Sequence, residues 1–251
     1  MELYRLERQA AGAGRIHMKK TRIAIITARG GSKRIPGKNI KSFCGRPILA
    51  YSIEAALQSG LFQEVMVSTD SLEIAETARK YGAQVPFLRS SKNADDYATT
   101  ADVLLEVLHQ YKEIGKCFDY LCCIYPTAPF VTAEKLRSAM QLMETCHPAA
   151  VYPVVAYSYP PQRCFVMDSR HCLEYKYPEY IQARSQDLET QYHDAGQFYI
   201  YQTSAYLKNQ GRITKDILPI VLSELEVQDI DCETDWKLAE LKYQMCAGIN
   251  G

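Results

Sequence analysis

The stretch IAIITARGGSKRIPGKN, residues 23–39, begins as an apolar, β-branched strand and turns abruptly into glycine and positive charge. Gly30 and Gly31 follow the strand directly and allow a close approach of the backbone to a ligand. The same loop carries a cluster of cations: Arg29, Lys33, Arg34 and Lys38. Ligands of open α/β sheets bind outside the carboxyl ends of the strands. The stretch therefore predicts a buried strand followed by a loop that holds a polyphosphate.

Two familiar phosphate-binding fingerprints do not fit this loop. A P-loop requires G-x-x-x-x-G-K-[ST], whereas five residues separate Gly31 from Gly37, and Asn39 follows Lys38 where a hydroxyl is needed. Pro36 also removes one N–H from the possible cradle. The dinucleotide fingerprint G-x-G-x-x-G is absent as well. A solvated basic loop without a ligand remains the alternative on charge alone.

Outside the loop, apolar segments typical of strands alternate with segments of helical period. We expect strands at residues 23–27, 64–68, 85–88, 120–125, 197–201, 219–222 and 227–230. We expect helices at residues 47–59, 72–81, 100–114, 133–145 and 233–245. This alternation predicts the α/β class, with a mostly parallel, Rossmann-like sheet covered by helices on both faces.

Two segments depart from the alternation. Residues 156–192 are rich in Tyr, Pro, Arg and Gln without helical period, which predicts a small inserted arm or hairpin. Its aromatic side chains suit a partner interface, although ordinary amphipathic surface is an alternative. Residues 1–17 show no strand or core pattern, and we interpret them as a tag remnant or an upstream extension. Residues 18–251 are expected to form a single domain.

Composition excludes several classes of partner. The formal net charge is zero, which argues against nucleic acid and against an anionic membrane surface. No apolar run approaches the roughly 18 residues of a membrane span, and the N-terminus lacks a secretory signal, so we expect a cytoplasmic protein. The 9 cysteines lack zinc-type spacing, which predicts reduced thiols with no disulfide and no zinc.

A pair of carboxylates near the C-terminus is the second charged feature. In the segment VQDIDCETDW, residues 227–236, Asp229 and Asp231 flank Ile230 at strand spacing, which points both carboxylates to one face. Mg²⁺ that carries substrate phosphates is a common solution for such a pair. Asp231 could instead be the N-cap of the helix that follows. Asp-x-Asp also occurs in metal-dependent glycosyltransferases, a competing class of enzyme.

Several segments together carry a resemblance to a known family. Besides the two motifs above, these are GRPILAYSIEAAL, VMVSTDSLEIAETARKYGA, PFLR, DDYATTADVLL and IYPTAPF. Over residues 22–245 the chain resembles the CMP-sialic acid synthetase (acylneuraminate cytidylyltransferase) family of nucleotidyltransferases. The segment RSQDLETQYHDAGQFY, residues 184–199, most resembles the branch of that family that acts on pseudaminic acid.

The resemblance implies a reaction and a set of residues that perform it. The anomeric hydroxyl of a nonulosonic acid would attack the α-phosphorus of CTP and expel pyrophosphate. Arg29 and Lys33 would hold the triphosphate, and Lys38 would lie near the α-phosphate. Asp229 and Asp231 would hold Mg²⁺, and one of them or a metal-bound hydroxide would take the hydroxyl proton.

The resemblance also implies how the nucleotide is bound. Arg89, Thr99 and Thr100 would lie beside cytosine, whose O2 and N3 acceptors match guanidinium donors, and Asn39 would lie at the ribose. The alternative for Arg89 is an ordinary surface arginine. The complete set of nucleotide-binding residues that we expect is Ala28, Gly30, Gly31, Ser32, Asn39, Arg89, Thr99 and Thr100.

The expected sugar pocket departs from that of the sialic acid enzymes. Tyr125 stands where they carry Gln, which favours a substrate with more apolar surface, such as pseudaminic acid. His193 and Gln197 would read amide groups, and Arg184 would bind the carboxylate, although His193 could simply pair with Asp194. N-acetylneuraminic and legionaminic acids are alternative substrates, and Kdo is less favoured.

The family resemblance implies a homodimer in which the arm of one subunit closes the sugar pocket of the other. Two functions of other classes remain open from the residues alone. One is the metal-dependent glycosyltransferase, which would bind a sugar nucleotide, and the other is a nucleotide sensor without catalysis.

Overall fold

The computed structural model describes residues 20–95 and 97–249, so the expected leader at residues 1–17 lies outside the described residues. The central sheet contains β1 (Arg22–Thr27), β4 (Glu64–Ser68), β5 (Tyr120–Ile124), β6 (Ala150–Ala156), β9 (Tyr192–Asp194), β10 (Phe198–Gln202) and β11 (Ile217–Val221). Its helices are α2 (Ile48–Ser59), α3 (Leu72–Lys80), α4 (Thr100–Glu113), α5 (Ala133–Cys146), α6 (Thr203–Lys208) and α7 (Glu233–Ile249).

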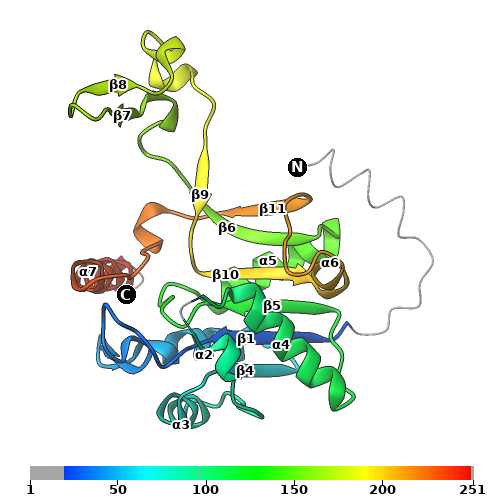
Figure 1. Ribbon diagram of the computed structural model, residues 1–251. Helices are drawn as coiled ribbons and strands as arrows, with labels where there is room; N and C mark the ends of the chain where they lie inside the picture. Colours follow the sequence, from blue (N-terminus) through cyan, green and yellow to red (C-terminus); the bar gives the residue numbers. More distant parts are fainter. Residues whose placement is uncertain (1–19, 96, 250–251) are drawn as a thin grey trace.

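The strands are ordered β11-β6-β10-β5-β1-β4, with β9 paired to β6 (Figure 1). β1 runs parallel to β4 and β5, and β11 runs parallel to β6. β10 lies antiparallel between β5 and β6. β5 and β6 therefore point the same way, and the sheet is parallel-rich, as predicted.

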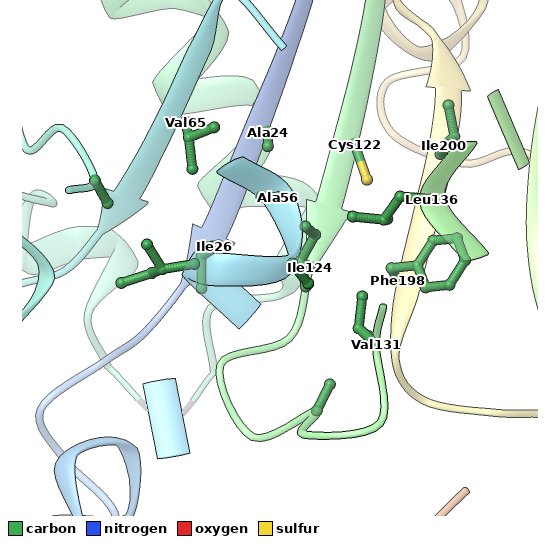
Figure 2. Packing of buried hydrophobic residues seen from close by; sticks show 14 of the residues in the cluster. Ala24, Ile26, Ala56, Val65, Cys122, Ile124, Val131, Leu136, Phe198 and Ile200 are labelled. Carbon is green, nitrogen blue, oxygen red and sulfur yellow. The ribbon is translucent and has the colours of Figure 1, made fainter. Parts of the chain in front are cut away.

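Helices cover both faces of the sheet because the central strands point apolar side chains to both faces. Ala24 and Ile26 of β1 face the helices α2, α3 and α5 together with Cys122 and Ile124 of β5 (Figure 2). Ile23 and Ile25 face the opposite side, where α4 and α6 pack. Both sets are fully buried. This two-sided burial confirms the predicted α/β architecture.

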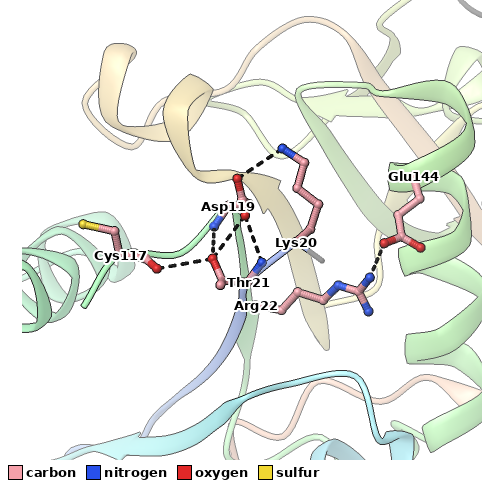
Figure 3. A network of polar contacts seen from close by, with 6 residues as sticks. All are labelled: Lys20, Thr21, Arg22, Cys117, Asp119 and Glu144. Carbon is pink, nitrogen blue, oxygen red and sulfur yellow. Dashed lines mark hydrogen bonds and ion pairs between the residues drawn. The ribbon is translucent and has the colours of Figure 1, made fainter. Parts of the chain in front are cut away.

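Polar contacts hold the amino-terminal ends of β1 and β5 together at the edge opposite the loop (Figure 3). The carboxylate of Asp119 accepts hydrogen bonds from the Thr21 N–H at 2.9 Å and the Thr21 hydroxyl at 3.1 Å. Lys20 contacts the same carboxylate, and Arg22 pairs with Glu144 of α5. These contacts fix the register at which β1 enters the sheet.

Two of the expected strands are wrong. Residues 85–88 form no strand, and only Gln84 bridges to Met66; Pro86 lacks the N–H that would continue the ladder. Residues 227–230 follow the 3₁₀ turn η6 (Glu224–Glu226) and join no strand. Lysine side chains occupy carbonyls that a ladder would use, because Lys242 donates to Val227 O at 2.8 Å and Lys38 donates to Ile230 O at 2.7 Å.

Two elements were not anticipated, namely β6 and the short helix α6. Pro153 lies inside β6 and argues against a strand in the sequence. In the structure Pro153 lies between two ladders, one at Val151 with β10 and one at Val154 with β9. The chain between β9 and β10 bulges there, with Gly196 at φ +62. The missing N–H therefore falls where this side of β6 has no ladder partner.

The chain between β6 and β9 forms an arm that projects away from the sheet (Figure 1). Its tip is a hairpin of β7 (Phe165–Met167) and β8 (Leu173–Tyr175). The arm also contains the 3₁₀ turns η3 (Pro161–Arg163), η4 (Pro178–Tyr180) and η5 (Ser185–Asp187). Its β7 and β8 residues are exposed, so the arm leaves apolar surface uncovered in this single chain.

The remaining small elements are one two-stranded ribbon and two 3₁₀ turns. A two-stranded ribbon is formed by β2 (Ser42–Phe43) and β3 (Arg46–Pro47), and the 3₁₀ turns are η1 (Lys38–Ile40) and η2 (Ser91–Asn93). Within the described part of the chain, none of the helices has the length and apolar character needed to cross a membrane.

Candidate active site

A cavity of about 450 Å³ lies where the chain leaves β1 and β5 at their carboxyl ends. One wall carries the cations of the basic loop, and the opposing wall carries two carboxylates. The cations are Arg29, Lys33, Arg34 and Lys38, and the carboxylates are Asp229 and Asp231. The rest of the lining consists of Thr27, Ser32, Asn39, Tyr125, Pro126 and Thr127. We name this space the first cavity.

The basic loop is held in shape by its own neighbours. Asn39 is buried and donates from Nδ2 to Arg29 O at 2.8 Å. The N–H of Gly30 donates to Asp70 Oδ1 at 2.8 Å, and a Cβ at Gly30 would meet Ser71 Cβ at 3.1 Å. A Cβ at Gly31 would meet nothing within 4 Å. A side chain at Gly30 would therefore crowd Ser71, while open space adjoins Gly31.

The carboxylate pair reaches the first cavity although its segment is not a strand. Ile230 is 1% exposed and packs in an apolar cluster with Trp236 of α7. This anchor leaves the residues on either side, Asp229 and Asp231, to line the cavity. Burial of Ile230 thus leaves both carboxylates on the cavity side, which is the arrangement that a strand was expected to give.

Cations of the loop contact the acidic segment directly. Arg34 Nη2 lies 2.7 Å from Asp231 Oδ1, and Lys38 Nζ lies 4.0 Å from the same oxygen. Burial lowers the pKa of Lys38, and the neighbouring Asp231 and Asp229 partly offset this shift. Partial burial and the nearby Asp231 raise the pKa of Asp229, and Lys38 opposes that shift. The site therefore favours an added cation beside Asp229.

Asp231 does not cap the last helix with its side chain in this structure. The carboxylate that closes the start of α7 belongs to Asp235, whose Oδ2 accepts from Asp231 N at 2.9 Å and from Cys232 N at 2.8 Å. The side chain of Asp231 faces Arg34 instead. These contacts favour the ligand interpretation of Asp231 over the N-cap alternative.

Several residues expected at the nucleotide do not line the first cavity. Ala28 is fully buried, and its N–H donates to Ser68 O at 3.0 Å. Arg89 is 8% exposed and donates to Ser68 O at 2.6 Å, so it is not a surface arginine. Thr99 caps α4 through a reciprocal pair of hydrogen bonds with Asp102, and Thr100 is the first residue of that helix. Ala28 and Arg89 therefore lie at the end of β4, whereas Thr99 and Thr100 lie at the start of α4.

A second cavity of about 460 Å³ adjoins the first and shares Asp229 with it. Its lining comes from β6, from β9 and the bulge after it, from η6 and the segment that follows it, and from α7. The residues are Val155, His193, Asp194, Ala195, Gly196, Glu224, Val227, Gln228, Asp229 and Lys242. Because Asp229 belongs to both spaces, its carboxylate lies at the boundary between them.

The structure separates the residues that were expected to read the sugar. Tyr125 lines the first cavity and His193 lines the second, where His193 Nδ1 lies 2.8 Å from Asp194 O. Gln197 is 2% exposed and donates to Glu226 O at 2.6 Å, so it packs beneath the second cavity. Arg184 lies on the arm, pairs with Asp187 at 3.0 Å and reaches neither cavity of its own chain.

Asp70 and Lys242 belong to the site but were not expected from the sequence. Arg34 was expected only as one of the loop cations, and its Nη2 donates to Asp231 Oδ1 at 2.7 Å. Asp70 follows β4 and binds the Gly30 N–H. Lys242 lines the second cavity from the last helix. Only the position at a carboxyl strand end could have indicated Asp70, whereas nothing in the local sequence indicates Lys242.

A parallel-rich sheet with a basic loop and a carboxylate pair in one cavity is the architecture of a nucleotidyltransferase. Residues 23–229 match the sequence model of the family described as cytidylyltransferase. The chain therefore belongs to the cytidylyltransferase family, as its motifs predicted.

Relatives of the chain are named as cytidylyltransferases or as synthases of CMP-linked acids. A pseudaminic acid cytidylyltransferase of Campylobacter jejuni subsp. jejuni serotype O:2 is 37% identical over 89% of this chain and 96% of the relative. A CMP-N,N'-diacetyllegionaminic acid synthase of Legionella pneumophila is 35% identical over 87% and 94%. A solved CMP:2-keto-3-deoxy-manno-octonic acid synthetase in complex with CTP shares the fold, with TM-score 0.64 and 18% identity over 91% of this chain and 99% of that chain.

Proposed function

We propose that this chain transfers CMP from CTP to the anomeric hydroxyl of a nonulosonic acid, with pseudaminic acid as the preferred acceptor, and releases pyrophosphate. The observation that carries the proposal is the pair of adjoining cavities with Asp229 at their boundary. One cavity offers cations to a triphosphate, and the other offers polar side chains to a sugar. The names of the relatives supply the class of acceptor.

In this proposal the basic loop binds the triphosphate. Arg29 and Lys33 would neutralise its outer charges, and Lys38 would lie nearest the phosphorus that is attacked. A pair of unit charges about 4 Å apart gains roughly 4 kcal/mol at an effective dielectric of about 20. Ser32, Asn39 and the open space at Gly31 would complete the phosphate and ribose contacts. Positioning and charge neutralisation, rather than covalent catalysis, would account for the rate.

The carboxylate pair fits a Mg²⁺ that is shared with the substrate. Among residues 20–95 and 97–249 no group of three or more His, Cys, Asp and Glu side chains could hold a metal. Mg²⁺ often takes only one or two carboxylates and completes its shell with phosphates and water. Asp229 and Asp231 would be those ligands, and Arg34 would exchange its contact with Asp231 for a phosphate. Bound Mg²⁺ would neutralise charge that develops on the phosphates during displacement.

The acceptor would enter the second cavity and present its anomeric hydroxyl toward Asp229. The cytosine would lie toward the end of β4, beside Arg89 and the backbone at Ala28, and Thr99 and Thr100 at the start of α4 would supply further contacts. Arg89 is already bonded to Ser68 there. Its charge would also favour the acceptor atoms of cytosine over the N3 proton of uracil.

The arm would complete the enzyme as a homodimer. Large apolar side chains on it are exposed, among them Phe165, Met167, Leu173 and Ile181, and a second copy of the chain would cover them. Arg184, which reaches neither cavity of its own chain, would bind the acceptor carboxylate in the partner's second cavity. In domain terms, residues 18–251 would form one cytidylyltransferase domain with the arm as an insertion at about 156–192. Because CTP is a cytoplasmic metabolite, we place the reaction in the cytoplasm.

Pyrophosphate release tests the proposal directly. The protein would be incubated with CTP, Mg²⁺ and one of four acids, namely pseudaminic, legionaminic, N-acetylneuraminic or Kdo. We expect the largest kcat/KM with pseudaminic acid. A higher value with N-acetylneuraminic acid would remove the preference but keep the reaction class. Binding of CTP without pyrophosphate release would indicate a sensor, and turnover of a sugar nucleotide alone would indicate a glycosyltransferase.

A further inference from the structure

The segment that carries the carboxylate pair is held by lysines from two sides. Lys38, which lines the first cavity, donates to Ile230 O at 2.7 Å. Lys242 of α7 lines the second cavity and donates to Val227 O at 2.8 Å and to Glu224 O at 3.1 Å. Lys242 therefore fixes the chain immediately before the carboxylate pair.

The ammonium of Lys242 keeps one hydrogen-bond donor for a ligand. A lysine ammonium has three N–H donors and no acceptor, and two of the donors go to the carbonyls of Val227 and Glu224. Among the described residues, the side chain forms no further hydrogen bond or ion pair. It is half-buried in the lining of the second cavity. The third donor is therefore available to an acceptor atom in that cavity.

The charge of Lys242 is not balanced by a carboxylate within the described part of the chain, because its hydrogen-bond partners are neutral carbonyls. Lys135 of α5 shows the contrast. It donates to Phe130 O at 2.9 Å, and its Nζ also lies 2.8 Å from Glu226 Oε1, so a carboxylate balances its charge. Hydrogen bonds in which a partner is ionised are the strong ones. An anionic ligand would thus gain more at Lys242 than at Lys135.

The rest of the second cavity disfavours an anion. Among the described residues of its lining, Lys242 is the only lysine or arginine, whereas carboxyl groups come from Asp194, Glu224 and Asp229. The ring of His193 is turned to the backbone, with Nδ1 2.8 Å from Asp194 O. Like charges repel, and a nearby cation offsets the repulsion. The charged group of an acidic ligand is therefore directed to the Lys242 end of the cavity.

The acceptor of the proposed reaction has its charge and its nucleophile on one carbon. In a nonulosonic acid the anomeric carbon bears both the carboxylate and the hydroxyl that attacks. A cation that holds the carboxylate therefore also sets the place of the hydroxyl. Lys242 and Asp229 line the same cavity, and Val227, which Lys242 holds, precedes Asp229 by two residues. The cavity thus offers a cation to the carboxylate and Asp229 to the hydroxyl.

We propose that Lys242 binds the carboxylate of the acceptor acid, and that its contacts with the carbonyls of Val227 and Glu224 hold this carboxylate in a fixed position relative to Asp229. This inference rests on the proposed function. A carboxylate has about four lone-pair sites, so Arg184 from the arm of a second subunit would bind the same group without displacing Lys242. The site would then reject an acceptor whose carboxylate is neutralised, because the ammonium would lose its ionic partner.

Two other lysines provide matched controls. Lys237 lies on the same helix, is exposed and lines neither cavity. Lys135 holds the acidic segment through Glu226 and also lies outside both cavities. Lys237→Met therefore repeats the change of net charge, and Lys135→Met repeats the loss of a lysine contact with the segment.

The test measures pyrophosphate release with the acid of highest kcat/KM and with its methyl ester, which keeps the anomeric hydroxyl and lacks the charge. For Lys242→Met the KM of the acid should rise roughly tenfold, about 1.4 kcal/mol, whereas the KM of the ester should stay within about twofold of wild type. An ester that is not turned over is compared by its inhibition constant against the acid. Lys237→Met and Lys135→Met should keep the wild-type ratio between acid and ester. An equal change for acid and ester in Lys242→Met would overturn the inference.

A second variant keeps the inference testable if Lys242→Met does not fold. Lys242→Gln retains an N–H donor for the carbonyls of the segment and removes the charge, and thermal unfolding would verify its fold. The preference for acid over ester should narrow in this variant too, and an unchanged preference would contradict the inference. If wild-type protein releases no pyrophosphate with any of the acids, the proposed function itself fails, which is a distinct outcome.

Discussion

At the scale of single residues, Asp231 and Arg34 show why a charge pattern alone does not define a site. The four cations of the loop look equivalent in the sequence, yet in the structure Arg34 lies 2.7 Å and Lys38 4.0 Å from Asp231 on the opposite wall. Exposed pairs of this kind contribute little stability. The contact instead joins two oppositely charged segments, far apart in the chain, at one cavity.

The carboxylate pair gives the first prediction. Asp229→Asn should lower kcat/KM at least about 100-fold, roughly 2.7 kcal/mol, because it removes the proposed metal ligand and the charge between the cavities. Activity should also vanish with a chelator and return with Mg²⁺. Glu233→Gln is the control, since Glu233 begins α7, pairs with Lys41 and lies outside both cavities. Loss of less than about tenfold in Asp229→Asn would exclude the role.

The second prediction concerns the substitution Arg89→Ala, which should change both the nucleotide preference and the stability of the fold. Arg89→Ala should narrow the preference for CTP over UTP, and it should reduce the free energy of unfolding by about 1 to 3 kcal/mol because Ser68 loses buried donors. Arg79→Ala is the matched control, since Arg79 also donates to a backbone carbonyl, that of Val85 at 3.0 Å. A wild-type protein that uses both nucleotides equally would remove Arg89 from base selection.

At the scale of elements, strong periodicity predicted most of the framework. The helices α2, α4 and α5 lie within one residue of their expected bounds because Gly60, the Thr99 cap and the Thr132 cap are local signals. The strand at 227–230 failed for a non-local reason. Its carbonyls are bonded by Lys38 and Lys242, and no local pattern indicates that side chains will replace a ladder.

The candidate site residues also divide into those that local sequence predicts and those that depend on contacts between distant segments. The loop next to β1 and the Asp-x-Asp segment could be predicted, because strand ends and charge are visible in the sequence, and the structure brings them into one cavity. Gln197 illustrates the limit. It is polar and close to His193 in the chain, but the bulge at Gly196 turns it into the interior, where it binds Glu226 O.

The third prediction belongs to the junction of α5 and η6. Lys135 Nζ lies 2.8 Å from Glu226 Oε1, and this hydrogen bond lowers the pKa of Glu226 below its ordinary 4.5. A depressed folded-state pKa stabilises the fold above pH 4.5, and the stabilisation is lost as the pH falls through the folded value. Because the pair is partly exposed, we expect less than about 1 kcal/mol.

The measurement is thermal unfolding of Glu226→Gln against wild type across acidic pH. The difference in Tm should be largest near neutral pH and narrow as the pH falls below 4.5. Glu224→Gln, in the same 3₁₀ turn, is the control for removing a carboxylate from another position of that turn. A Tm difference that persists unchanged in acid would attribute the effect to packing.

At the scale of the whole molecule, the exposed hairpin of the arm allows the proposed dimer to be tested. Met167 and Leu173 in the hairpin are each 61% exposed. Changing both to Asp should convert a dimer to a monomer in sedimentation analysis and reduce kcat/KM with the acid, since the partner's arm would be lost. Leu72→Asp is the control, because Leu72 is 68% exposed on α3, away from the arm. A monomeric wild-type protein with full activity would contradict this prediction.

A mixing experiment extends the same prediction to Arg184. The variants Arg184→Ala and Asp229→Asn, each expected to be inactive alone, would be mixed under conditions that exchange subunits. If Arg184 serves the partner's cavity, mixed dimers contain one intact site and activity returns. If Arg184 serves its own chain, every site keeps one defect, and mixing restores nothing.

The place of β10 in the chain has a consequence for synthesis. β5 and β6 are not neighbours in the sheet, because β10 lies between them. On a ribosome, residues 120–124 and 150–156 would emerge before the strand that joins them, and the whole arm would emerge first as well. Two unpaired strand edges would then wait for residues 198–202. Closure of the sheet is therefore a late event, and a chain interrupted within the arm would have no route to a continuous core.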